Sequence, residues 1–155
     1  MDSSINWVVG TFRSLTKCEL YAMFQLRVAV FVVEQNCAYN EIDGQDHLDG
    51  TVHYLGYKDA ELCCYARKLA PSQHSDAVRI GRVVVAQNHR GSGLATHLLQ
   101  KMIADNVSVN PQQFVALSAQ TSALGFYQQL GFIETSAMYL EDDIPHVDML
   151  LSPKA

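Results

Sequence analysis

The alternation of hydrophobic and polar positions predicts a strand followed by a helix in the first part of the chain. Residues 5–12 are rich in apolar side chains and predict a strand that enters from the N-terminus. Thr16 stands three residues before Glu19, the spacing of a capping box, which marks a helix start. Behind it, apolar side chains recur at helical spacing as far as Phe31. Residues 28–33 are rich in β-branched side chains, so the end of this helix stays open.

The pattern changes to strands in the middle of the chain. Residues 52–57 and 62–69 flank a polar turn at residues 58–61, as in a hairpin. Residues 78–85 predict a third strand. Gly81 in the middle of that strand indicates a β-bulge or the close approach of another backbone.

Helices and strands alternate in the second half of the chain. Residues 93–106 carry an apolar stripe at helical spacing. Ser122 is expected to cap a short helix that runs to Leu130, and Gly131 is expected to end it. Further strands are expected at residues 114–119, 132–138 and 146–151. This order of elements predicts an α/β (α+β) fold in which helices cover a sheet.

Length and composition favour one globular domain that covers residues 1–155. The chain is 48% hydrophobic, and no repeat or linker interrupts it. No apolar run approaches the roughly 18 residues of a membrane span. The N-terminus has no basic segment of the kind that opens a signal peptide, and the four cysteines form no C-x-x-C pair. These features predict a cytoplasmic protein whose thiols are reduced and lie mostly in the core.

The charges of the chain argue against nucleic acid as the main partner. The 16 acidic residues outnumber the 11 basic residues, giving a net charge of -5, whereas phosphate binding needs a basic surface. Acidic residues gather at positions 41–49 and 141–143. We interpret these clusters as solvated loops, with attraction of a cationic substrate as the alternative. The six histidines show no ligand spacing, so no metal is expected.

The most informative stretch is a glycine-rich turn between a predicted strand and a predicted helix. A β-branched strand leads through a polar turn into Arg90-Gly91-Ser92-Gly93 and directly into the helix. Glycines let backbone N–H groups converge at a helix start, where they suit a phosphate, and Arg90 adds a charge that can hold two phosphate oxygens. The alternative is a tight connection without a ligand. The stretch is neither a dinucleotide fingerprint, because Thr96 replaces the third glycine, nor a P-loop.

Two motifs together resemble the GNAT acyltransferases. Arg90-Gly91-Ser92-Gly93-Leu94-Ala95 matches R-x-x-G-x-G/A, and the segment from Ala123 to Phe132 is similar to A-x-x-F-Y-x-x-x-G-F. Their order and spacing fit the family, as does the order of elements. A narrower resemblance, to the ElaA-like subgroup of bacterial GNAT proteins, lies in residues 26–35, in Asp43-Gly44 and in residues 144–146.

The resemblance implies a fold and a cofactor. The fold would be a GNAT-type mixed, mostly antiparallel central sheet with a splayed strand pair, flanked by helices. The cofactor would be acetyl-CoA, and a thioester would enter where the strands around Val84 and Leu117 separate. Gln120 stands where many relatives carry an asparagine that contacts the cofactor. The cofactor-binding residues implied are Val83, Val84, Val85, Arg90, Gly91, Ser92, Gly93, Leu94, Ala95, Thr96, Gln120, Phe126 and Tyr127.

Amine acylation needs a neutral amine, a stabilised oxyanion and a proton for the departing thiolate. The resemblance implies that a backbone N–H near Val83 or Val84 serves the oxyanion. Tyr127 is the candidate general acid, because a phenol titrates close enough to a thiol to donate a proton to it; the alternative is that Tyr127 only packs. Glu34 is the leading candidate base, at the floor of a cleft where burial would strengthen it.

The substrate side of the site is less defined by the sequence. His53 and His146 are further candidate bases, because imidazole titrates closest to neutral pH. Arg27, a lone arginine on an apolar helix face, is expected to pair with an acidic residue such as Glu34, or else to bind a substrate carboxylate. The substrate-binding candidates are Arg27, Phe31, Glu34, His53 and His146.

These observations predict transfer of an acetyl group from acetyl-CoA to a primary amine of a small molecule or a peptide. The alternatives are a protein acetyltransferase acting on lysine or an N-terminus, a non-catalytic acyl-CoA sensor, and an acyl-homoserine-lactone synthase with a long-chain donor. An exposed edge is expected for the last strand, which favours a homodimer.

Overall fold

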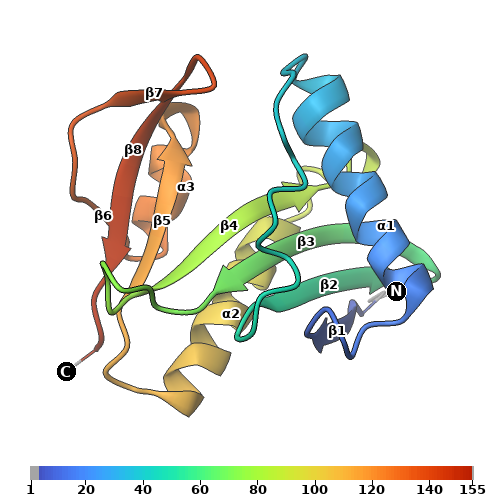
Figure 1. The fold of residues 1–155 in the computed structure, drawn as a ribbon, viewed down its shortest axis with the longest axis horizontal. Coiled ribbons are helices and arrows are strands. Elements are labelled where there is room, and N and C mark those ends of the chain that lie inside the picture. The colour runs from blue at the N-terminus through green and yellow to red at the C-terminus, as the bar shows by residue number, and fades with distance from the viewer. Residues whose placement is uncertain (1–3, 155) are drawn as a thin grey trace.

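The computed structural model describes residues 4–154 as one twisted sheet with helices on its faces (Figure 1). The strands are β1 Asn6–Gly10, β2 Val52–Lys58, β3 Glu61–Leu69, β4 Val78–Val85, β5 Val115–Gln120, β6 Ile133–Glu134, β7 Tyr139–Glu141 and β8 Ile144–Leu151. The helices are α1 Lys17–Arg27, a π-helical turn η1 Val28–Glu34, α2 Leu94–Val109 and α3 Leu124–Gln129, with short 3-10 turns η2 Gln87–His89 and η3 Thr121–Ala123. In the described residues no helix is long and apolar enough to cross a membrane.

The sheet consists of two halves that part from each other in the middle. The strand order is β1-β2-β3-β4-β5-β8-β6, and β7 pairs with another part of β8. All neighbours are antiparallel except β4 and β5, whose parallel pairing stops after Val78↔Val115 and Arg79↔Ala116. Beyond Arg79 the two strands diverge, as Figure 1 shows. The expected fold class, with its splayed strand pair, is confirmed.

A β-bulge in β4 lies at the point of divergence. Tyr65 pairs with Val84 and Arg67 with Gly81, so Arg82 and Val83 stand opposite a single residue of β3. Arg82 has a positive φ of 53°. The bulge predicted from Gly81 is confirmed, although it lies just after that glycine. The alternative of a close backbone approach is wrong, because a Cβ at Gly81 would meet nothing within 4 Å.

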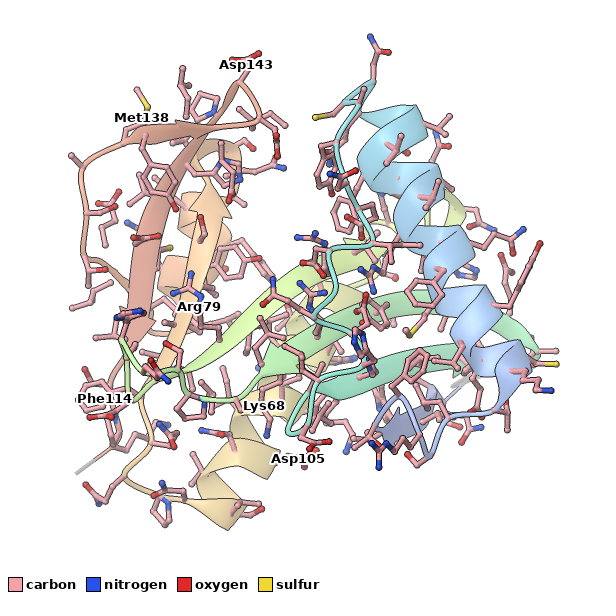
Figure 2. The ribbon with its side chains drawn as sticks, in the orientation of Figure 1. Lys68, Arg79, Asp105, Phe114, Met138 and Asp143 are labelled. Atoms are coloured by element: carbon pink, nitrogen blue, oxygen red, sulfur yellow. The ribbon has the colours of Figure 1, made fainter. Side chains whose placement is uncertain are left out.

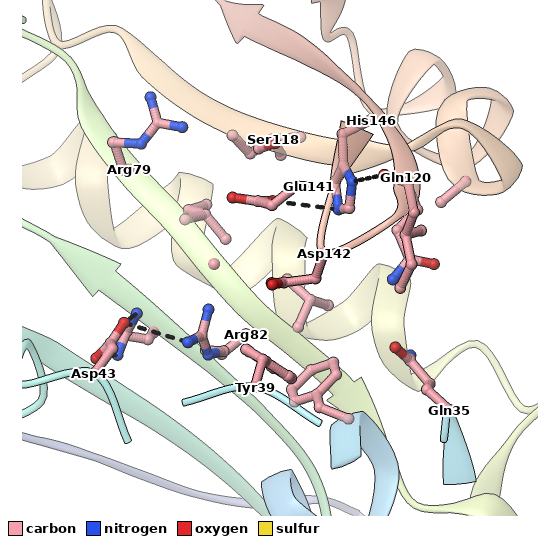
Figure 3. Close-up of a pocket in the computed structure, with 18 of the residues that line it drawn as sticks. Gln35, Tyr39, Asp43, Arg79, Arg82, Ser118, Gln120, Glu141, Asp142 and His146 are labelled. Atoms are coloured by element: carbon pink, nitrogen blue, oxygen red, sulfur yellow. Dashed lines mark hydrogen bonds and ion pairs between the residues drawn. The ribbon is translucent and has the colours of Figure 1, made fainter. Parts of the chain in front are cut away.

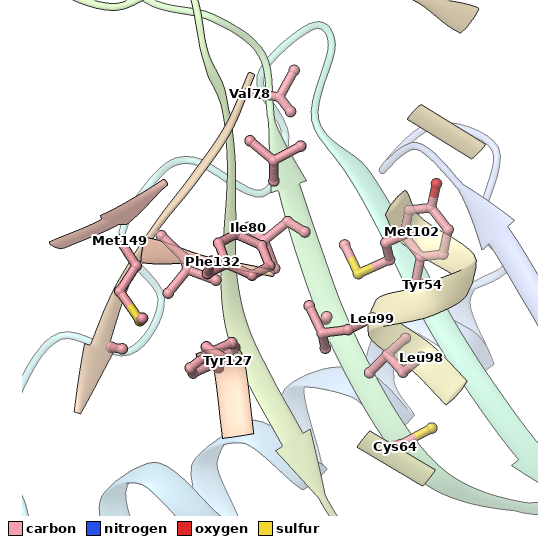
Figure 4. Packing of buried hydrophobic residues seen from close by; sticks show 14 residues of the cluster. Tyr54, Cys64, Val78, Ile80, Leu98, Leu99, Met102, Tyr127, Phe132 and Met149 are labelled. Atoms are coloured by element: carbon pink, nitrogen blue, oxygen red, sulfur yellow. The ribbon is translucent and has the colours of Figure 1, made fainter. Parts of the chain in front are cut away.

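The first half of the sheet is covered on both faces, because successive side chains of a strand point to opposite sides. Tyr54 of β2 faces α2 and packs with Leu98 and Met102 in the larger core cluster (Figure 4). The next residue, Leu55, faces α1 and packs in a second cluster with Met23. β4 takes part in both clusters, through Ile80 in the larger one and Val84 in the second.

The ends of several elements differ from the sequence expectations. The capping box of Thr16 and Glu19 is confirmed, and the first helix continues beyond Arg27 as the π-helical turn η1. Gly131 ends α3 with a φ of 98°, as predicted. The expected cap at Ser122 is wrong, because that residue lies inside the turn η3 and the N-cap of α3 is Ala123, which has no capping side chain.

The C-terminal strands also differ from expectation. The strand expected at 132–138 is only Ile133–Glu134, and a further strand, Tyr139–Glu141, forms a tight turn with β8. The last strand does not expose an edge, because β5 pairs with one side of it and β6 and β7 with the other. An exposed edge of the last strand therefore no longer supports a homodimer. The homodimer itself stays a prediction.

Candidate functional site

A cavity of about 570 Å³ lies where β4 and β5 diverge (Figure 3). One wall comes from η1, the following loop and the front of β3 and β4, and the other from β5, β8 and the β7–β8 turn. Tyr127 of α3 reaches the cavity from behind the splay. The polar and charged residues that line the cavity are Gln35, Tyr39, Asp43, Gln45, Arg67, Arg79, Arg82, Ser118, Gln120, Tyr127, Glu141, Asp142 and His146. Phe31 and Val83 contribute to the apolar part.

Tyr127 is held rigidly at the inner end of this cavity. Its ring makes edge-to-face contacts with Phe126 and Phe132, at centroid distances of 5.0 and 5.9 Å. Burial raises the pKa of Tyr127 to about 12. The phenol is therefore protonated at neutral pH, so it can act as a proton donor and not as a base.

His146 of β8 lines the opposite side of the same cavity. Its Nδ1 lies 2.7 Å from the carbonyl oxygen of Ile144. Because a carbonyl oxygen only accepts, Nδ1 carries a proton, so in the neutral ring the lone pair is on Nε2. Nε2 lies 3.4 Å from Oε2 of Glu141, a carboxylate that would stabilise the imidazolium once a proton arrives. The ring also stacks on Tyr139 at 6.1 Å, which fixes its orientation.

Tyr139 is itself anchored by polar contacts on the front of the sheet. Its hydroxyl donates to Oδ1 of Asp148 at 2.7 Å and also contacts the hydroxyl of Ser118. The side chains of β5 and β8 that surround His146 are therefore linked through Tyr139. No local sequence pattern predicts this arrangement, because its members come from β5, β7 and β8.

A buried cluster of three arginines and three carboxylates forms the base of the other wall. Its members are Arg27, Glu41, Asp43, Asp46, Arg67 and Arg82. The charges balance, as a buried ionic group requires. The cluster ties the loop after η1 onto β3 and β4, and so gives this wall of the cavity its shape.

Arg27 is a member of this cluster and not a substrate ligand. Its side chain is fully buried; Nε donates to Glu41 at 2.6 Å and Nη1 to Asp46 at 2.7 Å. The expected internal pair is thus present, but with these two residues in place of Glu34. The reading of positions 41–49 as a solvated loop is also wrong, because Glu41 and Asp46 are buried.

Two carboxylates of the cluster, Asp43 and Asp46, are held ionised by their arginine partners. Burial opposes the ionisation of Asp43 and Asp46. Hydrogen bonds and charges from Arg67 and Arg27 outweigh that effect and lower the pKa of both carboxyl groups. At neutral pH the cluster therefore consists of charges that neutralise one another, and it offers no free base.

His53 also belongs to the interior and not to the cavity. Its Nδ1 lies 2.6 Å from the hydroxyl of Tyr65, and its Nε2 lies 2.9 Å from the backbone oxygen of Asp46. Burial lowers the pKa of His53, so it stays neutral at physiological pH. The expectation that His53 binds substrate is not supported, because it does not line the cavity.

The glycine-rich turn forms a second hollow of about 370 Å³ beside the first. Gly91 and Gly93 have φ values of 79° and 80°, a conformation that favours glycine. The backbone bond from His97 to Gly93 opens α2, so the N–H groups of Leu94, Ala95 and Thr96 have no acceptor within the helix. Free N–H groups at a helix start suit the pyrophosphate of a nucleotide. Ser92 stands between the two glycines of this turn. Val85 and Phe126 line the hollow.

The segment between the two hollows suits an extended arm. Beyond Arg79, β4 has no strand partner on the side of β5. The edge of Val83, Val84 and Val85 is therefore open on that side, apart from the carbonyl oxygen of Val85, which accepts from Nε of Arg90. Leu117 and Gln120 of β5 line the first cavity across the gap. The residues implied for coenzyme A thus lie along one path, from the turn at α2 to Tyr127.

Arg90 and Glu34 pair with each other at the mouth of the glycine-rich turn. Nη2 of Arg90 lies 2.8 Å from Oε2 of Glu34, and its Nε donates to the carbonyl oxygen of Val85 at 3.1 Å. The Glu34 side chain is 34% exposed. The expectation that Glu34 lies at the floor of the cleft is therefore wrong, and its carboxylate is a neighbour of the phosphate-binding turn.

This pair leads to opposite predictions for its two members. Arg90→Ala is expected to weaken acetyl-CoA binding about tenfold, because a charged donor to phosphate is lost. Glu34→Gln is expected to tighten it, because a competing carboxylate is removed, and to leave kcat within about twofold. Calorimetric titration with acetyl-CoA measures both effects. A large fall in kcat for Glu34→Gln would restore Glu34 as the base.

Some residues of the cavity were not predicted from the sequence. They include Arg79, Arg82 and Ser118, which lie among hydrophobic residues on strands and belong to no sequence motif. Glu141 and Asp142 were seen only as part of an acidic run, which the structure places at the cavity rim in the β7–β8 turn. Only their position beside the splay gives these side chains a role.

Comparison with known proteins agrees with the motifs. The family model described as an acetyltransferase (GNAT) domain matches residues 21–153. Protein ElaA of Escherichia coli (strain K12) is 42% identical over 145 residues, covering 94% of this chain and 95% of ElaA. The crystal structure of Escherichia coli ElaA superposes with a TM-score of 0.89 and 41% identity, over 96% of this chain and 100% of the other.

Two further solved structures extend the comparison. An acyl-CoA N-acyltransferase from Pseudomonas aeruginosa is 40% identical, with a TM-score of 0.91 over 96% of this chain and 100% of the other. The CoA-dependent acyl-homoserine lactone synthase BjaI has a TM-score of 0.73 over 97% of this chain and 83% of the other, but only 18% identity. The last likeness concerns the fold alone.

Proposed function

The chain belongs to the GNAT acyltransferase family, in its ElaA-like branch, and from this premise we propose that it transfers the acetyl group of acetyl-CoA to a primary amine of a small molecule. The observation that carries the proposal is the placement of Tyr127 and His146 on one cavity at the β4–β5 splay. One is a protonated phenol, and the other is an imidazole that, in its neutral form, has its lone pair on Nε2. The site thus holds a proton donor and a proton acceptor in fixed positions.

The roles of the residues follow from this placement. When bound, acetyl-CoA supplies a thioester whose carbonyl carbon accepts the amine. His146 takes a proton from the amine nitrogen, and Glu141 stabilises the resulting charge. The bulge at Arg82 and Val83 leaves backbone groups without a ladder partner, and an N–H there would hold the oxyanion. Tyr127 gives its proton to the departing sulfur.

A pKa of about 12 for Tyr127 is compatible with this role. A thiol ordinarily titrates near 8.5, so in water the proton would move uphill. Burial raises the pKa of a thiol as it does that of a phenol, because both anions lose solvation. A thiolate released beside Tyr127 would share its apolar surroundings, which brings the two groups closer in proton affinity.

The packing behind the splay favours a short acyl group. Ile80, Leu117 and Phe132 are buried together in the larger core cluster (Figure 4). A long acyl chain directed inward would have to displace these side chains, and overpacking a close-packed core is unfavourable. Acetyl-CoA therefore fits better than the long-chain donor of an acyl-homoserine-lactone synthase.

Tyr127→Phe is expected to lower kcat about 10²-fold, because the ring still packs but the proton donor is lost. The test measures release of free coenzyme A from acetyl-CoA with a panel of small amines and of lysine peptides. Acetyl-CoA affinity and thermal stability of the variant should stay near those of the wild type. Unchanged turnover would remove Tyr127 from the mechanism.

The same panel separates the competing functions. Activity on peptides and on no small amine would favour a protein acetyltransferase. Tight binding of acetyl-CoA without acetylation of any amine in the panel would favour a sensor.

A further inference from the structure

The two walls of the main cavity carry opposite charges. On the wall formed by β3 and β4, Arg67 and Arg82 are balanced by the carboxylates of the buried cluster, so its unbalanced charge is Arg79; the β7–β8 turn contributes Glu141 and Asp142 (Figure 3). An acceptor that binds as a neutral amine would make no use of these opposite charges. An acceptor that carries one positive and one negative group would match both walls.

Arg79 differs from the other two arginines of its wall. Arg67 and Arg82 each have a carboxylate oxygen 2.8 Å away, in Asp43 and Glu41. Arg79 has no such partner within 4 Å among residues 4–154, and its side chain is exposed. An arginine that lines a cavity without a carboxylate partner is available to bind an anion, and its planar guanidinium suits a carboxylate.

The fold directs Arg79 toward the cavity. Val78 and Ile80, its neighbours in β4, are buried in the core behind the sheet, so Arg79 points to the opposite face. It pairs with Ala116, the residue of β5 where the two strands begin to separate. Figure 2 shows Arg79 at this point, between the two halves of the sheet. Arg67, which lines the same wall, is buried and is paired with Asp43 and Asp46, so it does not compete with Arg79 for an anion.

The distance from Arg79 to His146 limits the size of the acceptor. Arg79 pairs with Ala116, and His146 pairs with Gln120 on the same strand. Four residues of a strand span about 13 Å. The side chains of Arg79 and His146 both line the cavity, so an acceptor that contacts both is a small molecule no longer than about this span.

We infer that the acceptor is a small zwitterion, a primary amine that also carries a carboxylate, of the free amino acid class. Arg79 binds the carboxylate, and His146 with Glu141 receives the amine. The inference rests on the proposed function and specifies its substrate. The ammonium group of the zwitterion first gives one proton to His146, which releases it to solvent. The neutral amine nitrogen then forms an amide bond to the acetyl carbon as the carbon–sulfur bond breaks. His146 takes the second amine proton, and Tyr127 protonates the sulfur and regains its proton from solvent.

Other classes of acceptor fit the cavity less well. A diamine would place its second positive charge against Arg79. A lysine side chain of a protein offers a cation to the acidic wall but no carboxylate to Arg79. The division of charge between the walls therefore favours the zwitterion over both.

Matched acceptors test the inference. Each amino acid is compared with its amide, which has the same side chain and no carboxylate, in the acetyl-CoA assay. The wild type is expected to prefer the amino acid. Arg79→Ala should lower kcat/KM for the amino acid about 10- to 100-fold, mainly through KM, and leave kcat/KM for the amide within about twofold. Arg79→Lys should retain part of the preference. Arg13→Ala, an exposed arginine that does not line the cavity, is the control.

The possible outcomes separate this inference from the proposed function. Equal activity on acids and amides, or an equal loss for both in Arg79→Ala, overturns the zwitterion and keeps the acetyltransferase. If the wild type acetylates no amine, the proposed function fails. Calorimetry with the same acids and amides, on protein saturated with coenzyme A, then decides the inference. Binding of acids that depends on Arg79 supports it, and binding that ignores Arg79, or no binding, overturns it.

Discussion

Replacing His146 with glutamine is expected to lower kcat about 10²- to 10⁴-fold, the range for loss of a general base. Glutamine can still donate to the carbonyl oxygen of Ile144, but it cannot take a proton at the position of Nε2. Acetyl-CoA affinity should not change, because His146 does not line the glycine-rich turn. The measurement is kcat for the best amine of the panel over a range of pH.

The pH profile decides whether His146 acts as a base. The acidic limb of kcat should disappear in His146→Gln, because the group that must lose a proton is gone. His74→Gln, a change at an exposed histidine outside both cavities, is the control. A variant at His146 that keeps most of its activity and its acidic limb would show that another group, or water, takes the proton.

Arg27→Ala is expected to reduce the free energy of unfolding by about 3–5 kcal/mol, because it leaves Glu41 and Asp46 buried without their main partner. Lys101→Ala breaks an exposed pair with Asp105 and should cost less than about 0.5 kcal/mol. Urea denaturation at neutral pH measures both. A loss for Arg27→Ala no larger than that for Lys101→Ala would mean that the cluster does not hold the cavity wall.

The pH dependence of this loss has a definite sign. The pKa of Asp46 is lowered: burial opposes ionisation, but Arg27 and Arg67 outweigh it. A carboxyl group with a lowered pKa stabilises the fold above its unfolded value of about 3.9, and this contribution fades as the pH falls through the folded value. The difference in the free energy of unfolding between wild type and Arg27→Ala should therefore have its full size at pH 7 and become smaller below about pH 4. A constant difference over that range would contradict the account of the cluster.

Local features of the sequence predicted most of the fold and the cofactor path. The glycines at 91 and 93 need positive φ wherever the chain folds, and the first turn of a helix always has free N–H groups. The spacing of hydrophobic residues in helices and strands is also a local feature, so it predicts the order of the elements directly. The splayed strands came only from the resemblance to a family, because divergence of two strands leaves no pattern in either one.

Pairing between distant residues could not be read in the same way. Arg27 was given a partner near it in sequence, Glu34, but its partners lie on a loop 14 and 19 residues away. Glu34 in turn pairs with Arg90, 56 residues away. The path of the loop after η1 decides these pairs, and hydrophobic periodicity does not specify a loop. Arg79 was missed for a related reason, since an exposed arginine on a strand gains meaning only from the cavity beside it.

The edge of the sheet shows how one unseen turn changes a conclusion. The expectations were a strand at 132–138 and an exposed edge on the last strand. The turn between β7 and β8 adds Tyr139–Glu141 to that side, which covers the edge and brings Glu141 within 3.4 Å of His146. The same turn therefore removes the argument for a dimer and completes the proposed base.

The most direct test of the account is a thermal-shift titration of the wild type with acetyl-CoA. At 100-fold excess over the dissociation constant, binding to the folded state should add about 2.7 kcal/mol of apparent stability. For a domain of this size we expect a saturable rise in melting temperature of roughly 5–10 °C. Absence of a shift with acetyl-CoA and with any other acyl-CoA would contradict the claim that the turn at α2 and the β4–β5 splay hold this donor.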